Sequence, residues 1–366
     1  EVFSTLQYAG AKQTFQEEQR QLEPCSYYTP NQLQPSRAPG FTEHCGLKLN
    51  KHDAVFNPRS GSWRERNSQT LINDLLHPSH DFRHFIGHSS PELDLGEDNK
   101  GAKTLEEIHG PSIYIDFNPH FGHFITHSCA FAVPLLAAED LLEGEPHQSI
   151  NILSTTPITD WARNLLQAAS SAPLNFIQIP SSHGVRASQL VTTPSSWIEW
   201  HYCNSNHRDL FQAMASKLQL QQGSQDGEGI QDKIYLSRSR ITEGLRTSIN
   251  EDVLEAELSQ RGFSILHPQE MTLSQLIPAL SRAQLVAGPV GSAMHNILFA
   301  NNQDQLTTLN FCHHLANNVI LIENICQTKR NIHSFSTYEE VNQGKSCLRF
   351  DIDACLDATD AVLSAL

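Results

Sequence analysis

Three histidines stand close together in the segment NPHFGHFITHS, at positions 120, 123 and 127. Residues three or four apart share one face of a helix, so His123 and His127 would meet on one side, with His120 one turn before them. An imidazole has an unperturbed pKa of about 6.5 and can take up a proton near neutral pH, as a general base must. His123 and His127 are therefore candidate catalytic bases.

Two other interpretations compete with the catalytic one. The spacing His123-x-x-x-His127 also suits a zinc pair, but Phe124 stands where the H-E-x-x-H signature has its glutamate, which disfavours a metal site. Alternatively, His120 and His127 are ordinary polar residues of a helix. For His127 the catalytic and the structural interpretation both stay open.

Three arginines form a second set of chemically suggestive residues. Arg238, Arg240 and Arg246 follow the apolar run 234–236, which predicts a buried strand. Guanidinium groups bind phosphate through charge-assisted hydrogen bonds. Further along, Gly288–Ser292 reads GPVGS and precedes a predicted helix, whose first N–H groups are free to meet an anion. These features predict a phosphate or pyrophosphate ligand, with Arg240 as a plain surface charge.

Strand and helix signals alternate around both sets of residues. The predicted strands cover 112–116, 150–153, 176–179, 234–236, 263–266, 284–287 and 306–309. The predicted helices cover 121–142 with a bend at Pro134, 161–169, 207–220, 248–261, a segment from Thr272, and 352–366; 316–325 suits either state. Ser248 with Glu251, and Thr272 with Gln275, are spaced as capping boxes. Such alternation is typical of parallel sheets that bind ligands at their carboxyl edge.

The alternation predicts an α/β protein with two Rossmann-like domains. We expect an irregular lead-in over 1–70, a first domain over 71–205, a second over 206–345, and a C-terminal helix over 346–366 that crosses back to the first domain. The polar, glycine-rich segment 221–232 indicates a loop or linker.

Composition narrows the class of protein. The 366 residues carry a net charge of −15, from 25 basic and 40 acidic side chains, which disfavours a nucleic-acid partner. No apolar run approaches the length that crosses a bilayer. The eight cysteines form no C-x-x-C pair, so we expect reduced thiols in a cytoplasmic protein. The chain opens with EVFSTLQYAG, without Met or a secretion signal, and we expect a trimmed start.

The block 233–299 resembles the carboxyl-terminal half of glycosyltransferase family 61. The shared residues are Ser237-Arg238, Arg246, Asn250-Glu251, Gly262-Phe263, Pro268, Glu270, Gln275 and Gly288-Pro289-x-Gly291-Ser292-Ala293-x-x-Asn296. Many members have His where this chain has Val290, and the Gly-Ser-Ala-Met-His-Asn sequence is similar to that of the bacterial branch. The resemblance extends over roughly 110–345.

This resemblance implies an inverting glycosyltransferase of the GT-B type, with two Rossmann-like domains facing across a cleft. It implies a nucleotide-diphosphate sugar donor, a UDP-sugar first, and a glycan hydroxyl as acceptor in capsule or other surface polysaccharide synthesis. The donor-binding residues would be Arg238, Arg246, Glu270, Gly288, Pro289, Gly291, Ser292, Ala293 and Asn296. Because arginines and a helix start can neutralise the diphosphate, we expect no metal and no cofactor.

The resemblance also bears on the base. It aligns Gly122-His123 with a Gly-His or Asn-His motif, and many relatives carry Glu or Asp three or four residues later, where this chain has His127. Two alternatives stay open: a polysaccharide pyruvyl transferase, and a sugar-binding relative that has lost catalysis. We expect no transmembrane segment, although peripheral membrane association is compatible with the sequence.

Overall fold

The computed structural model describes residues 25–29, 32–36, 40–42, 46–57, 62–68, 70, 72, 75, 106–142, 149–179, 184–198, 202–222, 232–241, 247–342 and 345–366. The chain divides into two compact units. The N-terminal unit contains Thr42–Met214, and the C-terminal unit contains Gln21–Phe41 with Ala215–Leu366. The change between them falls inside helix α8 (Ser205–Gln222), after the boundary that the sequence predicts.

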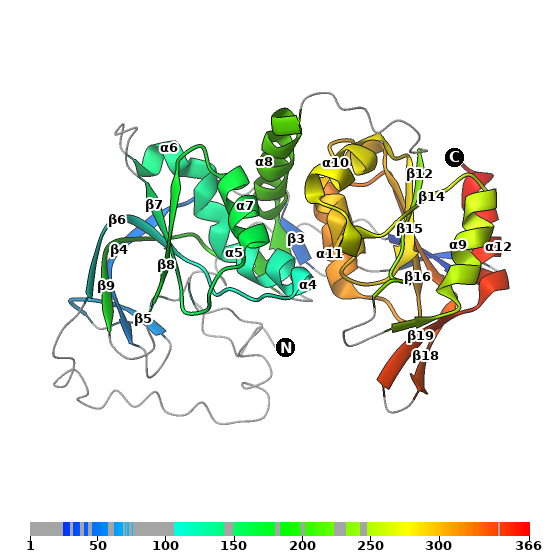
Figure 1. The fold of residues 1–366 in the computed structure, drawn as a ribbon, viewed down its shortest axis with the longest axis horizontal. Coiled ribbons are helices and arrows are strands. Elements are labelled where there is room, and N and C mark those ends of the chain that lie inside the picture. The colour runs from blue at the N-terminus through cyan, green and yellow to red at the C-terminus, as the bar shows by residue number, and fades with distance from the viewer. Residues whose placement is uncertain are drawn as a thin grey trace. The chain divides into compact units, whose positions relative to one another are not determined.

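A seven-stranded sheet forms the centre of the C-terminal unit (Figure 1), with the strand order β14-β12-β15-β16-β17-β1-β2. Its strands are β14 (Ser264–Leu266), β12 (Lys233–Leu236), β15 (Leu285–Pro289), β16 (Thr307–Cys312), β17 (Arg330–Phe335), β1 (Cys25–Thr29) and β2 (Gln32–Ser36). All neighbours pair in parallel except β1 and β2, which are antiparallel. The sheet therefore presents the ends of six strands at one carboxyl edge.

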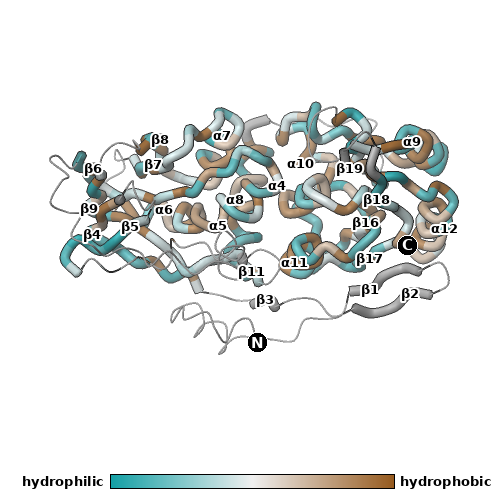
Figure 2. The backbone as a smooth tube through the Cα atoms, turned by 90° about the horizontal axis from the view of Figure 1, so that it is seen from below, coloured by the Kyte–Doolittle hydropathy of each residue, from teal (hydrophilic) through white to brown (hydrophobic). Residues whose placement is uncertain are grey.

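Helices cover both faces of this sheet. On one face, α9 (Glu251–Gln260) and α12 (Ile352–Leu363) share an apolar core with the strands. On the other lie α10 (Leu273–Arg282), the 3-10 turn η6 (Met294–Phe299) and α11 (Asn317–Cys326), as Figure 1 shows. Apolar and hydrophilic residues alternate along these helices in Figure 2, as expected of helices with one buried face. The C-terminal helix thus packs within its own unit, contrary to the predicted crossing.

Two small sheets and two short turns complete the described elements. One small sheet pairs β13 (Thr247–Ile249), β19 (Lys345–Phe350) and β18 (Thr337–Asn342); another has the order β10 (Trp197–Ile198), β11 (Tyr202–Asn204) and β3 (Gly40–Thr42). Short 3-10 turns lie at η5 (Pro268–Glu270) and η7 (Gln303–Gln305).

The N-terminal unit is built on a six-stranded mixed sheet with the order β5-β4-β9-β6-β7-β8. Strands β6 (Glu106–Tyr114), β7 (Ile150–Ser154) and β8 (Leu174–Gln178) are parallel, and β9 (Val185–Thr192) is parallel to β6 on its other side. Strand β4 (Asn50–Asn57) is antiparallel both to β9 and to the edge strand β5 (Ser62–Glu65). Together the two units form an α/β protein with parallel and mixed sheets.

A long helical stretch connects β6 to β7. It consists of α4 (Phe121–His123), a π-helical turn η3 (Phe124–Ser128), α5 (Cys129–Ala132), a 3-10 turn η4 (Val133–Ala137) and α6 (Ala138–Leu141). The sequence predicts this helix and a bend at Pro134, which lies in η4. Helix α7 (Asp160–Ala169) then connects β7 to β8.

This helical stretch is long and apolar enough to cross a membrane by length and composition, although the sequence suggests no such run. It is weak support for a membrane span, because 78% of its most apolar window is buried inside the protein. A helix in the core of a protein can be equally long and apolar without crossing a membrane.

Two local predictions differ from the structure. The predicted lead-in over 1–70 contains the five strands β1 to β5, four of which pair with strands of the two large sheets. The capping box of Ser248 and Glu251 is not formed: Asn250, with φ of 60°, precedes α9 without a side-chain cap. The capping box of Thr272 and Gln275 is confirmed at the start of α10.

Candidate functional site

The carboxyl edge of the C-terminal sheet has one position that favours ligand binding. From β12 the chain first goes to β14 on one side, and later to β15 on the other. Consecutive connections therefore leave β12 and β15 in opposite directions. In open α/β sheets such a switch point opens a crevice outside the strand ends, and ligands bind there. Arg238 follows β12, and Gly288–Ser292 ends β15 and follows it.

The structure brings these two predicted segments into contact. A Cβ atom added at Gly291 would lie 3.2 Å from Nη1 of Arg238, so the guanidinium group rests against the glycine backbone. Gly291 also has φ of 147°, which L side chains rarely adopt. A Cβ atom at Gly288 would lie 3.1 Å from the carbonyl oxygen of Leu236. Both glycines thus permit a close approach of the β12 and β15 ends.

Glu251 holds the backbone of the segment that carries Arg238. Its carboxylate is buried and accepts hydrogen bonds from the Tyr235 hydroxyl and from the backbone N–H of Arg238, both at 2.9 Å. Burial, with the nearby Glu251 charge, raises the pKa of Tyr235 well above its ordinary value. The phenol therefore stays protonated and keeps donating. The sequence spacing predicts only a helix cap for Glu251. The shared motif Asn250-Glu251 was a signal that this residue also has another role, which is to hold the backbone of Arg238.

The other predicted donor-site residues have different surroundings. Arg246 lies outside the described residues. Glu270 is exposed and pairs with Arg240 at 2.5 Å, so Arg240 neutralises the carboxylate expected to meet a ribose. Ser292 is exposed, and Ala293, not Ser292, precedes the turn η6. The predicted helix after the glycine turn is this six-residue 3-10 turn, so the expectation of an α-helix is wrong, and the anion site stays a prediction.

Two further members of the predicted set are part of the scaffold. Pro289 is the last residue of β15 and is buried there. Asn296 is buried, and its side-chain Nδ2 donates to the carbonyl oxygen of Ala293 at 2.9 Å. Both hold the shape of the glycine turn.

The N-terminal unit contains a carboxylate–imidazole pair at its own carboxyl edge. Asp116 follows β6, and Nε2 of His127 lies 2.8 Å from its Oδ2. The His127 side chain is 6% exposed and the Asp116 side chain 37%, so only the carboxylate opens to solvent. The pair comes from a strand end and from the π-helical turn η3.

His123 does not join this pair. It is exposed at the end of α4, and its ring lies 6.4 Å from that of His120, centroid to centroid. The two predicted bases therefore occupy different environments, one buried against a carboxylate and one at the surface. The sequence shows Asp116 only as the last residue of a predicted strand, because its contact with His127 depends on how the strand meets the helix.

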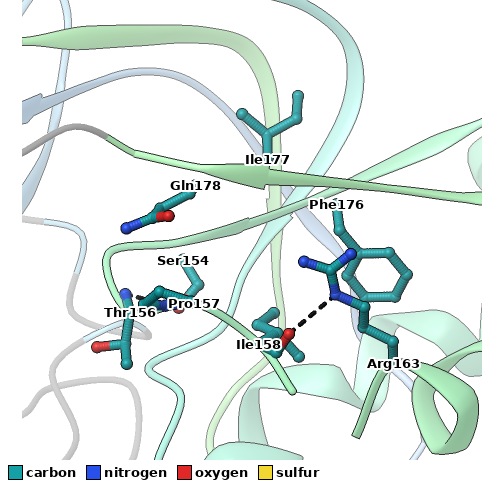
Figure 3. A pocket seen from close by; sticks show the side chains of 8 residues that line it. All are labelled: Ser154, Thr156, Pro157, Ile158, Arg163, Phe176, Ile177 and Gln178. Carbon is teal, nitrogen blue, oxygen red and sulfur yellow. Dashed lines mark hydrogen bonds between the residues drawn. The ribbon is translucent and has the colours of Figure 1, made fainter. Parts of the chain in front are cut away.

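Tyr114 and strand β7 lie beside Asp116 at the end of β6. Burial, with the charge of Asp116, raises the pKa of Tyr114 to about 12, so its hydroxyl is protonated at neutral pH. Ile115 donates its backbone N–H to the carbonyl oxygen of Leu153 at 2.8 Å, which keeps Asp116 beside the end of β7. A pocket opens at the ends of β7 and β8 (Figure 3), with a cavity volume of about 30 Å³.

Metal ligands are not gathered anywhere in the described part of the chain, where no three His, Cys, Asp or Glu side chains are placed to hold an ion. Six cysteines in those residues are buried and form no disulfide with one another. Burial raises the pKa of the Cys129 thiol well above its ordinary value, which keeps this thiol protonated and unreactive.

The switch point with its arginine and the strand-end carboxylate are features of a group-transferring α/β enzyme. A family model for glycosyltransferase 61 matches residues 121–307, from the start of α4 to the start of β16. This is over half of the 366 residues, and the chain belongs to that family and is a glycosyltransferase. The resemblance seen in the sequence is confirmed. No curated protein matches the chain.

Proposed function

We propose that the protein transfers a sugar, with inversion, from a nucleotide-diphosphate sugar to a glycan hydroxyl. A UDP-sugar is the preferred candidate for the donor, and the acceptor is a bacterial surface or capsular polysaccharide. The contact of Arg238 with Gly291 at the switch point carries this proposal, because it joins a cation and an open backbone where α/β folds bind phosphates.

On this proposal, the C-terminal unit binds the donor. Arg238 and Arg246 supply positive charge to the diphosphate, and the backbone near Gly291 approaches it closely. Charge-assisted hydrogen bonds of this kind also stabilise the nucleotide as it leaves. The charge balance of the leaving group then needs no metal ion. Glu270 reaches the nucleoside only if its pair with Arg240 opens.

The N-terminal unit supplies the base. In an inverting transfer, one base takes the proton of the acceptor hydroxyl while the nucleotide leaves from the opposite face of the sugar. Asp116 is the half-exposed member of its pair and is placed to accept that proton. Buried His127 donates to the carboxylate through Nε2–H and holds its orientation, or takes the proton onward. His123 is the alternative base.

A GT-B arrangement follows from these roles, because base and donor must meet the same sugar from two sides. The two units would then face each other across a cleft. The donor and acceptor chemistry suits a cytoplasmic enzyme that works beside the membrane where surface glycans are assembled.

The donor assignment is tested by thermal unfolding with a panel of nucleoside diphosphates. A ligand at ~100 times its dissociation constant adds roughly 2.7 kcal/mol of stability. We expect UDP to raise the Tm of the wild type, and Arg238→Ala to reduce the rise. If no nucleoside diphosphate shifts the Tm at millimolar concentration, the donor assignment is wrong.

A further inference from the structure

The pocket at the ends of β7 and β8 has a cation in its wall. Figure 3 shows the strand-end residues Ser154 and Gln178 on one side, and Arg163 of α7 with Phe176 on the other. The guanidinium carbon of Arg163 lies 5.2 Å from the centroid of the Phe176 ring. Its Nε donates to the carbonyl oxygen of Ile158 at 2.9 Å. These two contacts fix the plane of the guanidinium group.

Arg163 has no carboxylate partner among the described residues, and its two terminal nitrogens make no hydrogen bond with any of them. Arg186 of the same unit, by contrast, binds both Asp53 and Glu107. In a chain of net charge −15, an arginine held in place but left without an acid is available for a ligand. A planar guanidinium matches a carboxylate with two parallel hydrogen bonds.

The size of the pocket limits what it can take. A cavity volume of about 30 Å³ exceeds the roughly 10–15 Å³ that one water molecule needs, but it is too small for a sugar ring. One small substituent of a sugar does fit. The ring itself would lie outside, near exposed Thr156. Trp161, two residues before Arg163 in the sequence, presents an exposed aromatic side chain whose ring lies 4.9 Å from that of Phe124, centroid to centroid.

The pocket adjoins the Asp116–His127 pair. Strands β6 and β7 are parallel neighbours, and Tyr114 of β6 pairs with Leu153 of β7. Tyr114 also hydrogen-bonds the side chain of Thr155, which stands between Ser154 and Thr156 of the pocket. A sugar whose substituent enters the pocket therefore lies one strand away from Asp116.

We propose that this pocket binds the carboxylate of an acidic sugar in the acceptor glycan, with Arg163 as the specificity-determining residue. This inference rests on the proposed function, since it assigns the acceptor side of the same site. The acceptor is thus a uronic-acid-type residue, and a neutral sugar is a poorer substrate.

Ligand binding to the protein can be measured by saturation-transfer NMR with three probes: phenyl β-D-glucuronide, its methyl ester, and glucose 6-phosphate. The ester keeps the ring and removes only the charge. We expect the wild type to bind the glucuronide roughly three- to tenfold more tightly than the ester, as an ion pair open to solvent permits. Equal binding of acid and ester, or tighter binding of the phosphate, would overturn the proposal.

Variants locate the effect. Arg163→Gln should abolish the preference for the acid, and Arg163→Lys should keep part of it, because lysine retains the charge without the planar fork. Arg330→Gln is the matched control: it makes the same charge change in the C-terminal unit, where Nη1 of Arg330 donates to the carbonyl oxygen of Ala365, and should keep the full preference. A preference that persists in Arg163→Gln refutes the assignment.

UDP-induced thermal shifts in the same samples separate the two proposals. Wild-type UDP shifts with no acid preference refute the acidic acceptor and leave the donor assignment standing. An acid preference that Arg163→Gln removes, in a protein that binds no nucleotide, refutes the donor assignment and supports the pocket.

Discussion

Replacing Gly291 by alanine tests the candidate donor site most directly. Gly291 has φ of 147°, and an added Cβ would lie 3.2 Å from Nη1 of Arg238. Ordinary carbon contacts begin at about 3.5 Å, so the guanidinium group must move by about 0.3 Å. Gly291→Ala therefore has two effects: it strains the backbone, and it displaces the cation that we assign to the diphosphate.

A matched control separates these effects. Gly262 also has a positive φ, 80°, but an added Cβ there meets only the flexible end of Lys233, at 3.4 Å from Nζ. Both alanine variants should lose about 1–3 kcal/mol of unfolding free energy through backbone strain. Only Gly291→Ala should weaken UDP binding, by about three- to tenfold. Full loss of a hydrogen bond to a charged group would cost about 1.5–3 kcal/mol, or roughly ten- to hundredfold.

The assay combines urea unfolding, which gives the free energy, with titration calorimetry of UDP at a temperature where both variants are folded. The reasoning fails if the two variants bind UDP alike, whether both weakly or both as tightly as the wild type. It also fails if Gly291→Ala loses no stability, because the observed backbone conformation would then be no constraint.

Four further outcomes are expected. Arg238→Ala should weaken UDP binding by roughly ten- to hundredfold in calorimetry, and an unchanged affinity would show a mere surface charge. Asp116→Asn should lose most sugar transfer while keeping UDP binding, whereas His127→Gln should shift the pH profile of transfer; normal transfer in both variants places the base elsewhere. Transfer should survive EDTA, and loss of activity that zinc restores would make a metal part of the mechanism. Arg186 lowers the pKa of Asp53 below its ordinary 3.8. The ion pair of the two residues therefore stabilises the fold above pH ~4, and this stabilisation is lost as the pH falls through the lowered pKa. In Tm measurements Arg186→Gln should destabilise the protein at pH 7 and have less effect at pH 2.

The sequence predicted most of the α/β alternation because buried parallel strands and amphipathic helices carry local periodic signals. It missed β1 to β5 because their signal is not local. β1 pairs with β17, and β4 pairs with β9. Strand β2 reads QLQPS, a polar run with a proline that suggests a loop, and such an edge strand exists because a partner aligns it.

Tertiary contacts also explain the missed cap at Glu251. The spacing of Ser248 and Glu251 is that of a capping box, and it would satisfy backbone groups at the start of a helix. In the folded chain the Tyr235 hydroxyl and the Arg238 N–H compete for the same carboxylate and bind it. Both partners are buried or half-buried and come from β12 and the residues just after it, so no local pattern could reveal them. A short motif thus located an important residue and gave it the wrong partner.

The Asp116–His127 pair shows the same limit at the candidate base. Helical spacing alone predicts that His123 and His127 act on one face, and it leaves Asp116 as a strand residue. The π-helical turn over Phe124–Ser128 changes the winding between the two histidines, and His127 turns inward to the strand end while His123 stays exposed. Turns of this kind often occur at functional sites, where they redirect one side chain. The local departure from regular helix is therefore what couples the imidazole to the carboxylate, and it leaves Asp116 as the more exposed member of the pair, to which we propose that an acceptor hydroxyl gives its proton.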